Sequence, residues 1–247
     1  ISKKLTEKQR LKIVDSIYGI FTLYPSSPKS FFSAIYIFDT FLLKTKRSSF
    51  KEDEIVVLGM VCIFMASKLE DPHPLQLAHL LKLTHDKYPK EYFVKMEKEI
   101  LQTLDFDLVF SDIEDFIRNY IFDFCSTKMN KILKIKAKQC LLLLEKMSLF
   151  LAKVMLLFAE FSQYSLPIRS IACIILAFDI LRSNMKEDYT TEREKFIEGW
   201  IHYLIEESKI PMKAVEGVYD IFSKKYKDQK SWKSYAPKII SILNTFE

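Results

Sequence analysis

The histidine and cysteine side chains of this chain are too scattered to predict a metal site or a catalytic dyad. Of four histidines, His79 and His85 lie six residues apart and would face different sides of a helix. The four cysteines stand in separate apolar stretches without a C-x-x-C pair, which is typical of free buried thiols in a reducing compartment. The sequence therefore predicts no metal and no cofactor. The cysteines are Cys62, Cys125, Cys140 and Cys173.

The carboxylates and glycines also fit no known catalytic motif. The 4 glycines are isolated, and no Gly-rich phosphate loop, G-x-S-x-G or H-E-x-x-H motif occurs. Glu70 and Asp71 are adjacent, as are Glu206 and Glu207, but adjacent residues on a helix do not face each other. We expect these carboxylates to be solvated charges, and the sequence predicts a protein that is not an enzyme.

Three charged residues, Arg10, Asp39 and Lys68, stand among apolar neighbours. Because a charge is seldom buried without a partner, Arg10 and Asp39 are expected to pair between the first two helices. Breaking such a pair would cost about 3–5 kcal/mol if it is buried. Lys68 has a simpler explanation as a cation at a helix C-terminus, which the helix dipole favours by about 0.3–1 kcal/mol.

Helical patterns that could position these residues fill almost the whole chain, and the scarcity of glycine argues against a β-rich fold. Capping boxes are predicted at Thr6–Gln9, Ser111–Glu114 and Thr191–Glu194, and Ser27 before Pro28 marks another helix start. The second helix would bury Phe31, Ala34, Ile35, Phe38, Phe41 and Leu42. Helices are expected from Thr6 to before Pro25, from Pro28 to about Leu42, and near residues 52–68, 74–83, 90–104, 111–125, 130–158, 166–182, 191–206, 211–226 and 237–246.

The helix near residues 52–68 is apolar almost all round, which predicts that other helices surround it. Its pattern recurs 111 residues later, where Ile168–Phe178 repeats Val57–Ser67 with Cys173 in the place of Cys62. The sequence therefore predicts an all-α fold of two tandem five-helix bundles, each built around a buried third helix. The expected domains are residues 1–109 and 110–247.

The charge balance and the ends of the chain indicate little about partners. Lys and Arg number 37 against 32 Asp and Glu, and a net charge of +5 permits an acidic partner without demanding one. No uninterrupted apolar stretch approaches ~18 residues, so no membrane span or membrane partner is expected. The chain begins Ile1-Ser2-Lys3 without an initiator methionine, and we expect a fragment of a longer protein.

Several motifs resemble the cyclin family, closest to the A/B mitotic type, along almost the whole chain. Met65-Ala-Ser-Lys68-Leu-Glu-Asp71 and the stretch Tyr92–Leu108 resemble the cyclin-box signature, and Tyr36–Leu42 resembles the family's second-helix motif. Phe150–Leu157 and Tyr164–Pro167 are similar to the start of the second cyclin fold. The spacings of 29 residues from Arg10 to Asp39 and from Lys68 to Glu97 also match the family.

The resemblance implies a regulatory subunit that binds and activates a cyclin-dependent Ser/Thr protein kinase in cell-cycle control, in the nucleus and cytoplasm. Cyclins pack their first repeat on the kinase αC helix and activation segment. By resemblance, Lys68 and Glu97 would hydrogen-bond the kinase, and Leu69, Leu101 and Phe106 would make apolar contacts, with Met65 as a further wall. Arg10 and Asp39 match the structural ion pair of the family.

Two further points of the resemblance concern other partners. The substrate-docking patch of the family corresponds here to Gln9–Ile13, Ser16 and Val56, so docking of kinase substrates would use a divergent patch. IIB-type transcription factors share the fold and bind DNA, which here would need the basic run at Lys128, Lys131, Lys134, Lys136 and Lys138. Nucleic acid is not the favoured partner, because that interpretation leaves Lys68 and Glu97 without a role. A cyclin that scaffolds without activating is the other alternative.

Overall fold

The computed structural model describes residues 5–24, 26–85, 87–127, 133–184, 199, 202–206, 208–228 and 232–241, with backbone alone at 124–127, 133–140, 184 and 240. Within these ranges the chain is helical and contains no strand, which confirms the predicted all-α class. No helix in these ranges is both long enough and apolar enough to cross a membrane. Contacts divide the chain into two compact units. Unit 1 takes in 1–110, 156–159 and 230–247, and unit 2 takes in 111–155 and 160–229.

The first two helices begin at the predicted caps. Helix α1 (Glu7–Leu23) starts after Thr6, whose hydroxyl accepts from the Gln9 backbone N–H at 3.2 Å while the Gln9 side chain accepts from the Thr6 N–H at 3.0 Å. Helix α2 (Pro28–Lys44) starts after Ser27, with proline at its first position. Both capping predictions are confirmed, and the six predicted core residues of α2 are buried.

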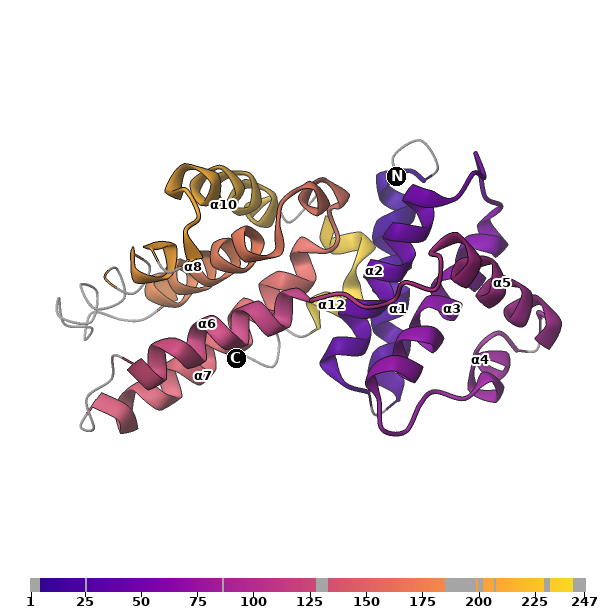
Figure 1. Cartoon of the computed structure of the whole chain (residues 1–247), viewed down its shortest axis with the longest axis horizontal. Helices are drawn as coiled ribbons and strands as arrows, with labels where there is room; N and C mark the ends of the chain where they lie inside the picture. The colour runs from indigo at the N-terminus through magenta and orange to yellow at the C-terminus, as the bar shows by residue number, and fades with distance from the viewer. Residues whose placement is uncertain are drawn as a thin grey trace. The chain divides into compact units, whose positions relative to one another are not determined.

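Unit 1 is built around α3 (Glu52–Glu70), which packs against α1, α2 and α5 (Figure 1). Cys62 and Ala66 on this helix are fully buried, and Gly59 lies against the side chains of Ile13 and Ile17. The unit also contains α4 (Leu77–Leu83) and α5 (Lys90–Thr103). The predicted burial of the third helix is therefore confirmed.

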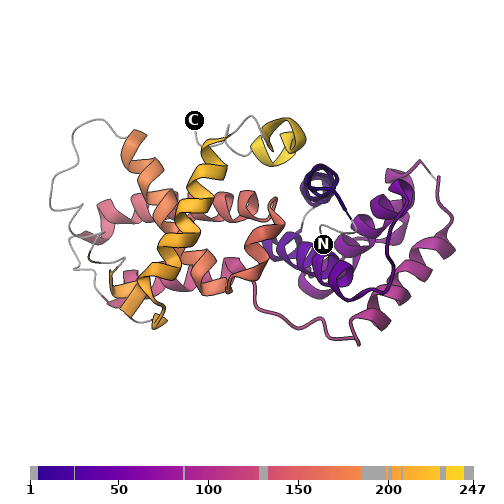
Figure 2. The ribbon, with the colours of Figure 1, turned by 90° about the horizontal axis from the view of Figure 1, so that it is seen from above.

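Unit 2 repeats this plan around α8 (Leu166–Asn184), which packs against α6 (Ile113–Thr127), α7 (Leu133–Met155) and α10 (Met212–Lys227) (Figures 1 and 2). Cys173 and Ala177 are fully buried, as are Cys62 and Ala66 at the matching positions of α3. The short helix η1 (Ala159–Gln163) places Phe161 edge-on to Phe222 of α10 at 5.4 Å between ring centroids. The two segments that the sequence predicted to be repeats are therefore both buried central helices, α3 in unit 1 and α8 in unit 2.

Three predicted boundaries differ from the structure. Helix α4 begins at Leu77 rather than near residue 74, because the Leu75 N–H donates to the Ser67 hydroxyl at 2.7 Å and holds this segment extended. The capping box predicted at Ser111 is wrong, since Asp112 accepts from the Asp115 N–H at 2.8 Å and is the cap of α6. Helix α7 ends at Met155, three residues before the predicted end.

Other sequence predictions lie outside the described residues. They include the capping box at Thr191–Glu194 and most of the helix near residues 191–206, of which residues 199 and 202–206 are helical. The helix near 237–246 is described only to residue 241. The division of the chain into domains of residues 1–109 and 110–247 stays a prediction.

The C-terminal segment packs on the first helix of unit 1. Helices η2 (Lys233–Tyr235) and α12 (Pro237–Ile240) contact α1, and Trp232 and Ile239 are fully buried (Figure 1). The Asp15 carboxylate, 5% exposed, accepts from the backbone N–H groups of Lys238 and Ile239 at 2.9 and 3.0 Å. Both N–H groups donate to the same oxygen, Oδ1. This atom therefore joins α1 to residues that follow Asp15 by 223 and 224 positions in the chain.

Two substitutions at Asp15 should distinguish how its negative charge and its role as a hydrogen-bond acceptor each affect stability. Asp15→Ala leaves two buried N–H groups unpaired and should lower the free energy of unfolding by about 1–3 kcal/mol. Asp15→Asn keeps an oxygen at Oδ1 and should be at least as stable as the wild type at pH 7. Urea unfolding followed by circular dichroism measures both, and equal losses in the two variants would contradict the acceptor role.

The pH dependence has a defined sign because burial raises the pKa of Asp15 above its ordinary value of 3.8, against the opposing effect of the two backbone N–H groups. A raised pKa in the folded state means that stability is greatest below the unfolded pKa and falls as pH rises through the folded pKa. The wild type should therefore lose stability relative to Asp15→Asn as pH rises above 3.8. A constant difference across that range would contradict this assignment.

Candidate functional site

An exposed cluster of charged and apolar side chains lies where the end of α3 meets α5. The Lys68 ammonium group in the last turn of α3 forms an ion pair with Glu97 of α5, and its Nζ lies 4.2 Å from the centre of the Phe64 ring. Leu69, next in the chain, is 49% exposed, and Phe106 just beyond α5 is 69% exposed. We call Lys68, Leu69, Glu97, Leu101 and Phe106 the α3–α5 patch.

The position of Phe106 follows from how α5 ends. The Phe106 N–H donates to the Leu101 carbonyl at 2.9 Å and the Asp105 N–H donates to the Gln102 carbonyl at 3.4 Å, which is the pairing of a Schellman motif. Asp105 and Phe106 have φ of 53° and 58°, a left-handed conformation that is uncommon without glycine. The turn therefore brings Phe106 back toward the last turn of α5, where Leu101 lies, and leaves its ring in solvent.

The structure adds one residue to this patch and places another beneath the surface. Val94 is 49% exposed and precedes Glu97 and Leu101 by three and seven residues, so the three share one face of α5. Helical spacing alone signals its place there. Met65, predicted as a further wall, is only 2% exposed and belongs to the core of unit 1. Its side chain is therefore buried although it lies only one turn before the exposed Lys68.

Arg10 and Asp39 meet inside unit 1 and join three segments of it. The Arg10 guanidinium donates through Nε and Nη2 to the two Asp39 carboxylate oxygens at 3.1 and 2.6 Å. Its Nη1 donates to the backbone carbonyls of Leu156 and Leu157 at 2.5 and 2.8 Å. Arg10 is 3% exposed, so this is a buried, bidentate ion pair that also satisfies two carbonyl groups after α7. The pair therefore has a structural position, away from the exposed patch.

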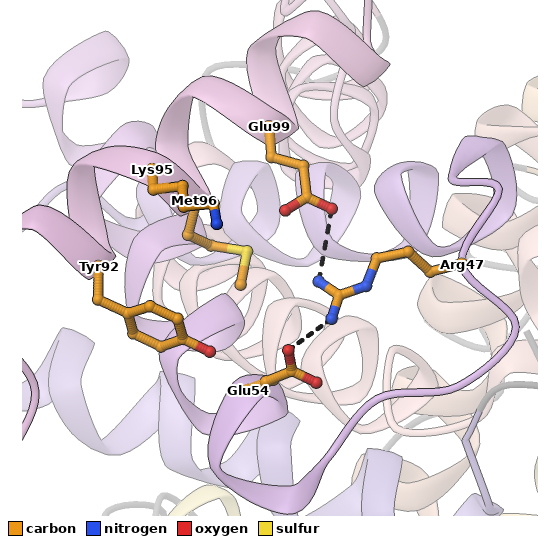
Figure 3. Close-up of a pocket in the computed structure, with 6 residues that line it drawn as sticks. All are labelled: Arg47, Glu54, Tyr92, Lys95, Met96 and Glu99. Atoms are coloured by element: carbon orange, nitrogen blue, oxygen red, sulfur yellow. Dashed lines mark hydrogen bonds and ion pairs between the residues drawn. The ribbon is translucent and has the colours of Figure 1, made fainter.

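A second charged cluster surrounds a hollow of about 250 Å³ in unit 1 (Figure 3). Arg47, in the loop after α2, donates to Glu54 of α3 at 2.5 Å and to Glu99 of α5 at 3.4 Å. Burial opposes the Arg47 charge, but these two carboxylates raise its pKa above the ordinary value. A hydrogen bond from the backbone N–H of Lys51 lowers the pKa of Glu54, and the hydrogen bond and charge of Arg47 lower it further. Sequence patterns gave no signal for this network, because its members come from three separate segments. The hollow is lined by Arg47, Glu54, Tyr92, Lys95, Met96 and Glu99.

The structure describes the surroundings of some residues considered for metal or nucleic-acid binding and not of others. Among the described residues, no group of three His, Cys, Asp or Glu side chains could hold a metal ion. Cys62 and Cys173 are buried free thiols, and burial raises the pKa of each well above that of an ordinary thiol. The side chains of the lysine run at residues 128–138 lie outside the described residues, as do those of Cys125 and Cys140.

The sequence is similar to that of known regulatory proteins over its first half. Residues 1–109 match the family model described as "Cyclin, N-terminal domain". A stretch of 117 residues is 30% identical to "G2/mitotic-specific cyclin-B3" of Mus musculus and covers 47% of this chain and 8% of that protein. Another of 118 residues is 26% identical to "G2/mitotic-specific cyclin-A" of Hydra viridissima and covers 48% of this chain and 27% of that protein. The chain spans less than half the length of these curated relatives.

Solved structures are similar to almost the entire chain. A viral cyclin from herpesvirus saimiri aligns with a TM-score of 0.63 at 14% identity, covering 97% of this chain and 89% of its own. A chain of the CAK complex from Chaetomium thermophilum bound to ATP-γ-S aligns with a TM-score of 0.61 at 14% identity, covering 96% of this chain and 72% of its own. At such identities these likenesses establish the fold.

Fold and site together define an all-helical protein with two buried central helices and an exposed α3–α5 patch on its first unit. The matches to the family model, to the curated relatives and to the viral cyclin agree on one assignment. Residues 1–109 of the chain are a cyclin N-terminal domain.

Proposed function

We propose that this chain is a regulatory subunit that binds a cyclin-dependent protein kinase through the α3–α5 patch and activates it. The observation that carries the proposal is the Lys68–Glu97 ion pair, which joins α3 to α5, together with the exposed side chains of Leu69, next to Lys68, and of Phe106 at the end of α5. Single exposed apolar side chains are common, but a group of them around a charged pair marks an interaction surface, and aromatic residues are enriched at the centre of interfaces. The kinase partner itself comes from the cyclin relatives and stays a proposal.

The proposed mechanism is selection of one kinase conformation. Kinase activity requires the ion pair between the β3 lysine and the αC glutamate, together with a correctly placed Mg²⁺-binding aspartate. A subunit that binds the kinase only with αC turned inward shifts the population toward that state. A shift from 1:99 to 99:1 requires about 5.5 kcal/mol of differential binding. The apolar side chains of the patch would supply affinity, and Lys68 and Glu97 would fix the orientation.

The deciding experiment combines this chain with purified cyclin-dependent kinases and measures both binding and histone phosphorylation. Lys68→Ala and Glu97→Ala should each weaken binding at least about tenfold, which equals about 1.4 kcal/mol, and lower activation accordingly. Lys87→Ala is the matched control, because it removes an exposed Lys87–Asp53 ion pair of unit 1 that lies outside the patch. Absence of both binding and activation across the kinases would refute the proposal.

The remaining outcomes distinguish the alternatives. Binding of a kinase without activation would indicate a cyclin that acts as a scaffold.

Binding to DNA with a steep loss of affinity at higher salt would favour the transcription-factor interpretation. Contacts to phosphate release counterions and are therefore weakened by salt, whereas an apolar kinase interface is not. We also propose, from the names of the relatives, that the protein acts in the cell cycle. A location in the nucleus and cytoplasm is a separate proposal, which fluorescence microscopy of the tagged protein would test.

A further inference from the structure

We propose that Ser49 is a phosphorylation site for a protein kinase that selects serines preceded by basic residues. Ser49 lies in the loop between α2 and α3, where residues 44–51 contain four basic residues and no acidic one. Kinases choose substrates largely by such charge patterns. Lys46 and Arg47 precede Ser49 by three and two residues, and the exposed Lys46 can reach acidic side chains beside the active site of the modifying kinase while the Ser49 hydroxyl enters that site. The four basic residues are Lys44, Lys46, Arg47 and Lys51.

The fold presents Ser49 at an exposed tip held from both sides. Before the tip, the Arg47 N–H donates to the Thr45 hydroxyl at 3.3 Å. After it, the Phe50 ring lies 6.1 Å from that of Phe41, between centroids, and 4.5 Å from the Arg47 guanidinium carbon. Ser48 and Ser49, between these anchors, are both exposed. A modifying kinase can therefore reach the Ser49 hydroxyl without unfolding α2 or α3.

The modification is a phosphoryl transfer from ATP. The Ser49 Oγ forms a bond to the γ-phosphorus, the bond from that phosphorus to the β–γ bridging oxygen breaks, and ADP leaves. The hydroxyl proton passes to the catalytic base of the modifying kinase. The product carries about −1.5 to −2 charge at pH 7 where the loop was positively charged.

The new phosphate would compete for Arg47 with the carboxylates around the hollow in Figure 3. Two residues of extended chain span about 7 Å, so a phosphate on Ser49 can reach the Arg47 guanidinium. Phosphate oxygens accept the guanidinium fork bidentately, and the Arg47 bonds to Glu54 and Glu99 would then be lost. Because the Arg47–Glu99 ion pair joins the loop to α5, its loss on phosphorylation should make the backbone of α5 open more often. Any effect on a bound kinase rests on the proposed function, whereas the loosening of α5 does not.

The test incubates the chain with ATP and a purified kinase that prefers basic residues two and three positions before serine, and locates the phosphate by mass spectrometry. Phosphate on Ser49 is expected, with at least tenfold less incorporation in Ser49→Ala and little change in Ser48→Ala. Lys46→Ala, which changes an exposed side chain, should lower kcat/KM about fivefold or more. Hydrogen exchange should then show α5 amides opening about two- to fivefold faster after phosphorylation.

Several results would overturn the proposal. Phosphate on Thr6 instead would do so, since Thr6 follows Lys3 and Lys4 and its hydroxyl caps α1. Phosphorylation of a peptide of residues 43–53 under conditions that leave the folded chain unmodified would show that the fold protects the loop. Unchanged exchange of α5 after modification of Ser49 would refute the coupling through Arg47 while leaving the kinase-binding proposal untouched.

Discussion

Replacing Asp39 by alanine is expected to lower the free energy of unfolding by about 3–5 kcal/mol. Among the described residues, the substitution leaves the Arg10 guanidinium, 3% exposed, with the carbonyls of Leu156 and Leu157 as its remaining acceptors. A buried charge without its counter-ion is far more costly than a lost surface ion pair, because water cannot replace the missing carboxylate. Urea or thermal unfolding followed by circular dichroism measures the loss.

Two further variants make the Asp39 result interpretable. Lys87→Ala removes an ion pair of 2.8 Å whose two side chains are 60% and 61% exposed, and it should leave the unfolding midpoint unchanged. The double variant Arg10→Met with Asp39→Leu removes both charges and should recover part of the loss, because the carbonyls of Leu156 and Leu157 then lack the Arg10 donor. A small effect of Asp39→Ala would show that the pair contributes little to the fold, and no recovery in the double variant would show that the unpaired Arg10 charge is not the source of the loss.

Truncation of Phe106 to alanine is expected to weaken kinase binding about 30-fold or more, equivalent to about 2 kcal/mol. The ring is 69% exposed on the free chain, at the end of α5 where Leu101 of the patch lies, and we expect it to act as an aromatic anchor at the centre of the interface. The Schellman turn depends on backbone hydrogen bonds, so the variant should keep its fold. Isothermal titration calorimetry against a purified cyclin-dependent kinase gives the affinity.

Val109→Ala is the matched control for Phe106. Val109 lies three residues further along the chain and is 92% exposed, but it is outside the α3–α5 patch. Its truncation should change the affinity less than about twofold, since an exposed side chain outside the contact contributes little. Equal effects of the two substitutions, or no effect of Phe106→Ala, would contradict the assignment of the patch.

The sequence was sufficient for features that depend on local pattern. The central helices were predictable because Val57–Ser67 and Ile168–Phe178 are apolar on all sides, and only a helix enclosed by others tolerates that. The start of α1 was predictable because Thr6 and Gln9 satisfy each other's backbone N–H groups within one turn. The Arg10–Asp39 pair was predictable from charges in apolar surroundings, although its additional carbonyl acceptors were not.

Features that depend on distant contacts or unusual backbone were not visible in the sequence. The Schellman turn after α5 has Asp105 where glycine is common, so nothing marked the position that exposes Phe106. The burial of Met65 and the exposure of Val94 depend on which way α3 and α5 face, and Val94 carries no charge or motif to single it out. Asp15 looked like an ordinary surface carboxylate because its two partners lie at the other end of the chain.

That long separation has a consequence for how the protein is made. The Asp15 carboxylate can form its hydrogen bond to the Lys238 N–H only after the ribosome has added 223 more residues. At about 5–20 residues per second, the ribosome takes roughly 11–45 s to add them. During this interval the surface of α1 that later contacts η2 and α12 is open to chaperones and to other nascent chains. The first unit can therefore complete its folding only after residues 238 and 239 have been synthesised.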